Sequence, residues 1–101
     1  MIYEHRASLT TASGVASTAT LRIAHGYGNQ LLVRANTADT VFRVVLTDES
    51  GTTRRHYGFH KGELNDTSDA IRFAMAGSYG IQITGAAPDD TFLVVLAVDE
   101  H

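Results

Sequence analysis

The stretch MAGSYGIQITGAAPDDTFLVVLAVDE, residues 75–100, contains two apolar runs with a polar segment between them. In the first run, apolar residues occupy every second position from Tyr79, which is the period of a β-strand. The second run, residues 92–98, is apolar throughout. The intervening Ala87-Pro88-Asp89-Asp90 is typical of a turn. This stretch therefore predicts two consecutive β-strands, at 79–84 and 91–98.

The same pattern extends across the rest of the chain. Short runs rich in Thr, Val, Ile and aromatic residues alternate with turn signals at the spacing of about 8–12 residues seen in all-β domains. The signals are Ser13-Gly14, Gly26 to Asn29, Asn36 to Asp39, Glu49-Ser50-Gly51 and Gly77-Ser78. We expect strands near residues 2–10, 17–25, 30–36, 41–48, 52–59, 70–75, 79–84 and 91–98. The fold class predicted is all-β, a single-domain antiparallel β-sandwich over residues 1–101, with about seven or eight short strands in an immunoglobulin-like or jelly-roll-like arrangement.

The segment SDAIRFAMAG, residues 68–77, has two interpretations. Ser68 and Gly77 would suit the two ends of a helix. The alternation of Ile71, Phe73 and Met75 with other residues favours a strand, joined to the next strand around residues 76–78. Tyr79 then enters a strand just after a glycine turn. That is the position of a tyrosine corner, and also of an ordinary half-buried strand residue.

Composition excludes several classes of function. With 101 residues the chain fits one domain, and 44% hydrophobic against 19% charged residues suits a folded globular protein. The net charge of −3 and the single lysine argue against a general nucleic-acid binder. The absence of cysteine excludes disulfides, thiolate metal sites and a cysteine nucleophile. The charged start MIYEHR and the short apolar runs lead us to expect neither secretion by a signal peptide nor a membrane helix.

The final strand is apolar on both faces, with Leu93, Val95 and Ala97 opposite the core-facing residues. A strand with one solvated face alternates apolar and polar residues, so we expect something to cover the second face. We interpret Leu93 and Val95 as part of an interface with another chain. The alternative is that the loop 59–69 of the same chain folds over them.

The segment TRRHYGFHKG, residues 53–62, concentrates basic and aromatic residues. Interleaved bases and aromatics occur in single-strand nucleic-acid binders, but acidic residues bracket this segment. His56 and His60 lie roughly 13 Å apart along an extended strand, too far to share a metal ion. We interpret the segment as a β-hairpin strand running into a contact loop, with Arg54 and His56 on one face. The candidate interface residues, besides Leu93 and Val95, are Arg54, Arg55, Tyr57, Phe59, His60 and Lys61.

No catalytic constellation is evident. A nucleophile elbow is absent, and no Ser, His and Asp set is marked out by its context. Asn65 to Asp69 offers oxygen ligands without the spacing of an EF-hand, so a turn is the favoured interpretation over a calcium site. We expect no enzyme activity, no metal and no cofactor.

In its general character the chain resembles the small β-sandwich structural proteins of tailed bacteriophages. The features shared are a short cysteine-free sequence rich in Thr, Ala and Val, and the closing pattern MAGSYGIQITGAAPDDTFLVVLAVDE. The resemblance implies a virion component made in the host cytoplasm, such as a capsid decoration or neck or tail accessory protein. Its partners would be copies of itself or a larger viral structural protein, with no nucleic acid and no membrane. The alternative is a carbohydrate-binding or adhesion module, using Tyr27 with Asn29 or Tyr57 with Asp66.

Overall fold

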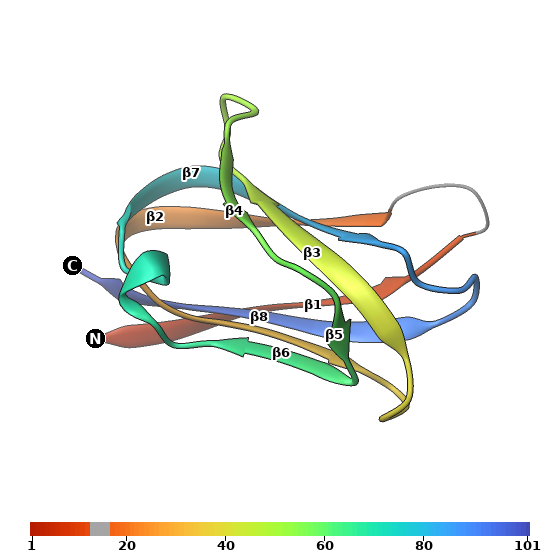
Figure 1. The fold of residues 1–101 in the computed structure, drawn as a ribbon. Coiled ribbons are helices and arrows are strands. Elements are labelled where there is room, and N and C mark those ends of the chain that lie inside the picture. The colour runs from red at the N-terminus through yellow and green to blue at the C-terminus, as the bar shows by residue number, and fades with distance from the viewer. Residues whose placement is uncertain (13–16) are drawn as a thin grey trace.

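The computed structural model describes residues 1–12 and 17–101 of the chain, which are almost entirely β-structure (Figure 1). The elements of these residues are β1 (Ile2–Thr10), β2 (Ser17–Ala35), β3 (Val41–Thr47), β4 (Thr53–His56), β5 (His60–Lys61), β6 (Glu63–Asp66), the 3-10 turn η1 (Asp69–Ile71), β7 (Ala74–Thr84) and β8 (Thr91–Glu100). All the strand pairs are antiparallel, so the predicted all-β antiparallel fold is confirmed. The turn predicted at Ser13-Gly14 lies outside the described residues. In the part of the chain that is described, no helix is long and apolar enough to cross a membrane.

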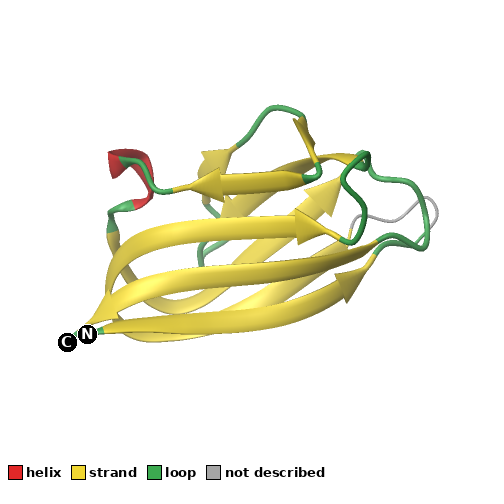
Figure 2. Cartoon of the chain, turned by 90° about the horizontal axis from the view of Figure 1, so that it is seen from below, coloured by secondary structure: helices red, strands yellow, loops and turns green. Residues whose placement is uncertain are grey.

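The strands form one hydrogen-bonded sheet that folds over on itself. Its order is β1-β8-β2-β7-β3-β4, with β6 added beside β2 and β5 beside β3. The first half of β2 pairs with β7, whereas its second half pairs with β8 and β6. Because β2 bends between these halves, the two parts of the sheet face each other as the layers of a sandwich (Figures 1 and 2). The rings of Phe42 in β3 and Phe92 in β8 meet across the core, with their centroids 5.0 Å apart.

The separate strands predicted at 17–25 and 30–36 are a single strand, β2, and the predicted turn at Gly26 to Asn29 is wrong. The glycines there allow the backbone of other segments to lie close to β2. A Cβ on Gly26 would overlap the carbonyl oxygen of Asp99, and one on Gly28 would overlap that of Ile71. The pairing register shifts on both sides of this segment, which lets β2 bend without ending.

The hairpin predicted around residues 76–78 is also wrong, because β7 runs without interruption from Ala74 to Thr84. Gly77 adopts a positive φ of 94° at the bulge where β7 pairs with the bend of β2. Of the helix considered for residues 68–77, only the short 3-10 turn η1 is present. Tyr79 is fully buried and its hydroxyl oxygen accepts a bond from the amide of Ala76, 3.3 Å away, within a continuous strand rather than at a corner.

The hairpin predicted at 41–48 and 52–59 exists but is shorter than expected, because β4 ends at His56. The next residues do not form the expected loop. Residues 60–61 return to pair with the start of β3, and residues 63–66 form β6 beside the second half of β2. This segment therefore lengthens the sheet at its edge.

The core lies between the two halves of the sheet. Its largest fully buried side chains come from β2, β3, η1, β7 and β8: Phe42, Phe92, Ile23, Leu31, Leu46, Ile71, Met75, Ile81, Ile83, Leu96, Val33 and Val44. On the opposite face of β8, Val95 and Ala97 are also buried within the single chain, with 3% and 2% of their surface exposed.

Neighbouring strands supply the cover for this outer face. Val95 lies opposite Arg6 of β1 and Leu32 of β2, and Ala97 lies between Glu4 and Gln30 in the same way. Short apolar side chains are thus shielded by longer ones on both sides. The burial of Val95 and Ala97 is thus explained by β1 and β2 of the same chain. It does not require another chain or the segment 59–69 as a cover.

Candidate contact surface around Phe59

Phe59 is the most exposed aromatic residue in the described part of the chain, with 63% of its surface accessible. It lies between β4 and β5, in the connection by which the chain continues along β3 from one short strand to the next. Its ring packs against the backbone of Gly85, where an added Cβ would lie 3.0 Å from Phe59 Cε1. Val41, at the start of β3, is also exposed on this side of the sheet. An aromatic and an aliphatic side chain therefore face solvent together.

Arg43 holds the Phe59 ring in place. Its guanidinium carbon lies 5.1 Å from the ring centroid, in cation–π geometry. Its Nη2 donates a 3.2 Å hydrogen bond to Nε2 of His56 on the neighbouring strand β4. No carboxylate among the described residues forms an ion pair with Arg43, and its buried Nε has no hydrogen-bond partner there. We call the group Val41, Arg43, His56, Phe59 and Lys61 the Phe59 surface.

Tyr57 points the opposite way, into the protein. Its hydroxyl donates a 2.6 Å hydrogen bond to Oδ2 of Asp66, and both side chains are buried. Oδ1 of Asp66 accepts bonds from the hydroxyl and amide of Ser68, at 2.6 and 2.9 Å. Arg55 completes this cluster, with its Nε 3.8 Å from Asp66 Oδ2 and its guanidinium carbon 5.1 Å from the Tyr57 ring centroid.

The environment shifts both acidic groups of the cluster. Burial raises the pKa of the Tyr57 phenol above its ordinary value, and the hydrogen bond to the Asp66 carboxylate raises it further. For Asp66, burial alone would raise the pKa, but the hydrogen bonds from Ser68 and Tyr57 and the charge of Arg55 together lower it below its ordinary value. The cluster therefore contains a carboxylate and a neutral phenol at neutral pH. Its polar atoms are used inside the protein, so Tyr57 and Asp66 present no ring or carboxylate to a sugar.

The other predicted residues of this segment are dispersed. Arg54 lies over the Phe73 ring, 4.2 Å from its centroid, and forms a 3.5 Å ion pair with Asp48. His60 is half-buried, with Nδ1 2.9 Å from the carbonyl oxygen of Gly58. Lys61 is exposed beside Val41 and lies 3.6 Å from a carboxylate oxygen of Asp39. Leu93 and Val95 belong to the outer face of the other layer.

Of the eight predicted interface residues, the structure therefore brings only Phe59 and Lys61 together on the exposed Phe59 surface. Sequence reasoning missed Val41, Arg43 and His56 as members of this surface. The available signal was the alternation in VFRVVLTD, which places Val41 and Arg43 on the side of β3 away from Phe42.

Metal binding finds no support in the arrangement of side chains. Residues 1–12 and 17–101 contain no group of three or more His, Asp or Glu side chains that could hold an ion. His56 is engaged with Arg43 and His60 with Gly58, and Asp66 is engaged within its own cluster. Two open hollows of about 220 and 330 Å³ lie around Arg34, whose guanidinium forms a 2.9 Å ion pair with Glu63.

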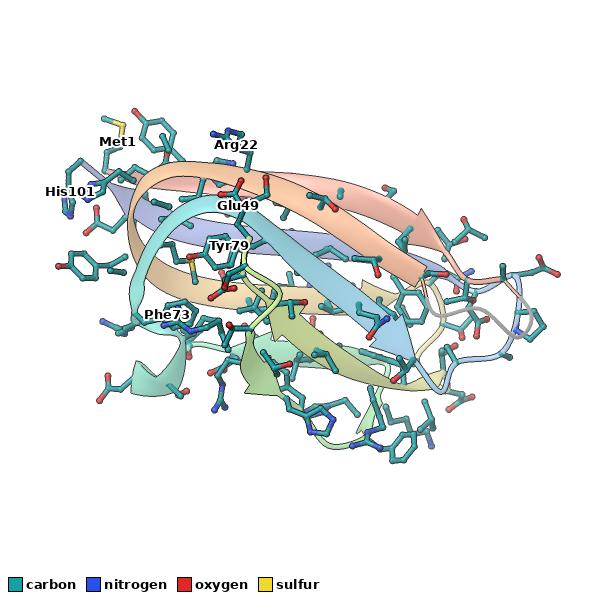
Figure 3. All side chains as sticks on the ribbon, turned by 90° about the horizontal axis from the view of Figure 1, so that it is seen from above. Met1, Arg22, Glu49, Phe73, Tyr79 and His101 are labelled. Atoms are coloured by element: carbon teal, nitrogen blue, oxygen red, sulfur yellow. The ribbon has the colours of Figure 1, made fainter. Side chains whose placement is uncertain are left out.

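A second exposed aromatic group lies where the two chain ends meet. Met1 and His101 are close together at one end of the molecule (Figure 3). The ring of Tyr27, which is 51% exposed, meets the His101 ring edge-on at 5.7 Å. The N-terminal ammonium lies 2.9 Å from Asp99, and its hydrogen bond and charge lower the pKa of that carboxyl below its ordinary value.

No model of a known protein family matches the chain, and no curated protein matches its sequence. Among solved structures, the chain is similar to part of a chain in the structure of the Gt strain of infectious bursal disease virus, with 18% sequence identity over 97% of its length and a TM-score of 0.35. The chain is also similar to part of a chain in the structure of the Gx strain, over 96% of the present chain, with 10% sequence identity and a TM-score of 0.30. The present chain spans about a third of those chains, 32% and 30% respectively.

Proposed function

We propose that the chain is a non-enzymatic structural protein of a virus particle, which attaches to a larger structural protein through the Phe59 surface. The single observation that carries the proposal is the exposed Phe59 ring, held by an arginine that has no carboxylate partner among the described residues. Aromatic residues and arginine are enriched at protein interfaces and often dominate their binding energy. The resemblance of the sequence to tailed-bacteriophage structural proteins supports the placement in a particle.

The chemistry of the surface indicates what the partner must offer. Phe59 and Val41 would lose water on entering an apolar pocket, which favours binding by about 25 cal/mol per Å² of apolar surface. The Arg43 guanidinium beside them would pair with a carboxylate at the rim of that pocket. We therefore expect the partner to present an apolar hollow flanked by Asp or Glu.

The test uses particles of the virus that encodes this chain. Mass spectrometry of purified particles would establish whether the chain is present. Particles lacking the chain are then mixed with the purified wild type or with Phe59→Ala, Arg43→Ala or Tyr27→Ala, and the chain that sediments with them is measured. Tyr27→Ala is the matched control, since it removes an aromatic residue of similar exposure that packs against His101 rather than Arg43.

We expect the wild type and Tyr27→Ala to sediment with the particles, and the other two variants to bind at least about tenfold more weakly, as for interface anchors. Absence of the chain from particles would overturn the virion role. Equal binding of Phe59→Ala would overturn the choice of surface.

The exposed Tyr27 ring favours the carbohydrate-binding module as a second candidate, since sugars stack on exposed aromatic rings. Binding to a glycan array that is lost in Tyr27→Ala and retained in Phe59→Ala would support this function. An array without a bound glycan would argue against it.

A further inference from the structure

β1 is a long strand with one open edge. All nine of its residues pair with β8 on one side. On its other side no strand among the described residues pairs with it, and it lies at one end of the strand order. Figure 2 shows the strand that starts at the N-terminus along the border of the sheet. A long edge with free backbone groups is a template for pairing with another strand.

The hydrogen bonds at the two ends of β1 show which backbone groups point to this edge. Met1 and Glu100 exchange bonds with each other, at 2.9 and 3.3 Å, and the amide of Thr11 donates to the carbonyl of Asp90 at 2.9 Å. In an antiparallel pair the direction alternates from residue to residue. The odd-numbered residues therefore bond to β8. The amides and carbonyls of Ile2, Glu4, Arg6 and Ser8 point outward.

A contact at Thr10 agrees with this direction. Thr10 is even-numbered, and its carbonyl oxygen accepts a 3.4 Å hydrogen bond from the hydroxyl of Ser17 rather than a ladder bond from β8. The unpaired outward backbone groups thus run from Ile2 to Ser8; β2 also contacts β1 but pairs with none of them.

The charges on β1 are self-complementary. Glu4 and Arg6 lie on the same exposed face of the strand, with Arg6 Nη2 2.6 Å from Glu4 Oε1. If a second β1 pairs antiparallel along the edge, outward-pointing residues must lie opposite one another. A register centred on Glu4 or on Arg6 places like charges opposite each other. A register centred on His5 places Glu4 of each copy opposite Arg6 of the other, and Ile2 opposite Ser8.

The start of β1 and the residue before it also carry exposed apolar surface. Met1, Ile2 and Tyr3 are three of the six large apolar side chains exposed in the described part of the chain. In the register centred on His5, Ile2 and Tyr3 of one copy lie beside Ser8 and Ala7 of the other, so pairing would remove part of their surface from water.

We propose that two copies of the chain join through their β1 strands, antiparallel about His5, so that the sheets of both copies become continuous. The interface is isologous, with the same residues contributed by each copy. It goes beyond the proposed attachment to a particle. It also uses none of the residues of the Phe59 surface, which come from β3, β4, β5 and the connection between β4 and β5.

The test is the molecular mass in solution, by native mass spectrometry and light scattering, over a concentration series up to about 1 mM, which still populates weak dimers. Glu4→Arg and Arg6→Glu each place like charges opposite one another in both pairs of the dimer. We expect each variant alone to dimerise roughly tenfold or more weakly than the wild type. In an equimolar mixture of the two variants, both pairs again join opposite charges, so a heterodimer should form.

Ser8→Pro tests the backbone contribution. Proline removes an amide that points to the open edge and leaves the bonds to β8 in place, so we expect a folded monomer. Arg72→Glu is the charge-matched control, since Arg72 is exposed and lies outside β1, and it should dimerise like the wild type. Circular dichroism and a melting curve for each variant establish that the monomer is folded.

A wild type that stays monomeric throughout the series would overturn the proposal. So would a dimer that tolerates both charge reversals and Ser8→Pro, or a mixture that gives no heterodimer. None of these outcomes changes what the particle-binding test says about Phe59.

Discussion

The phenolic oxygen of Tyr57 lies 2.6 Å from Oδ2 of Asp66, and the bond joins the edges of the two layers of the sheet. Tyr57 directly follows β4, which is paired with β3, whereas Asp66 is the last residue of β6, which is paired with β2. Short edge strands have few ladder bonds of their own. This buried side-chain bond therefore links two strands that are otherwise held from one side only.

Removing the Tyr57 hydroxyl should destabilise the protein. Tyr57→Phe leaves the ring in the core but deprives the buried Asp66 carboxylate of a hydrogen bond. Bonds to charged groups contribute about 1.5–3 kcal/mol, so we expect a loss of that size in urea unfolding at pH 7. Tyr27→Phe, at an exposed ring, is the control and should change stability by less than about 0.5 kcal/mol. Equal stability of the two variants would contradict the role given to the buried bond.

Asp66 should also contribute to the loss of stability in acid. Its pKa in the folded protein is below the ordinary value of 3.8, so the unfolded chain binds the proton more readily. The stability it contributes is complete above about pH 4 and is lost as the pH falls through the folded-state pKa.

The comparison of wild type with Asp66→Asn isolates this effect, because Asp48 and Asp99, whose pKa values are also lowered, are present in both proteins. We expect the wild type to be the more stable at pH 7 and the difference to shrink below pH 4. A difference that is constant from pH 7 to pH 3 would show that the Asp66 charge does not stabilise the fold.

Much of the fold could be predicted because strand formation is encoded locally. Alternating apolar residues in 79–84 and 41–47 mark the core-facing side chains, and these are buried as the alternation requires. The continuity of β2 and β7 was not predictable in this way. Gly26 resembles a turn residue, but the reason for it is the carbonyl of Asp99, more than seventy positions along the chain.

The candidate site illustrates the same limit. Alternation places Arg54 and His56 on the face opposite Arg55 and Tyr57, but it does not say which face is buried; in the structure Arg54 and His56 are exposed and Tyr57 is buried. It fails for Phe59 because the strand ends at His56 and the chain turns outward before that residue. The partner of Tyr57 was equally hidden, since the pairing of β6 with β2 brings Asp66 to it.

Gly28 should tolerate no side chain. A Cβ there would overlap the carbonyl oxygen of Ile71 and lie 2.6 Å from Met75 Cε, so Gly28→Ala forces the backbones of β2 and η1 apart. Overpacking of this kind typically costs about 1–3 kcal/mol. Gly58→Ala is the matched control, because no atom lies within 4 Å of its added Cβ. It should be neutral or stabilise by up to about 1 kcal/mol. Thermal unfolding measures both, and a Gly28→Ala protein as stable as Gly58→Ala would show that Ile71 and Met75 do not restrict this position to glycine.

Replacing Phe42 or Phe59 by alanine should change the stability of the protein by very different amounts. Phe42 has no exposed surface and packs against Phe92, so Phe42→Ala removes a ring from the centre of the core and should cost about 3–5 kcal/mol. A protein of this size has a total stability of about 5–15 kcal/mol, so that variant should melt far below the wild type. Phe59→Ala removes an exposed ring with its contacts to Arg43 and Gly85, and should change stability by less than about 0.5 kcal/mol.

Melting curves followed by circular dichroism distinguish these outcomes. A normal melting temperature for Phe59→Ala means that any loss of particle binding comes from the missing ring itself, because the fold is intact. A large drop would mean that Phe59 stabilises the connection between β4 and β5, and the exposed ring would then be part of the fold rather than a contact anchor.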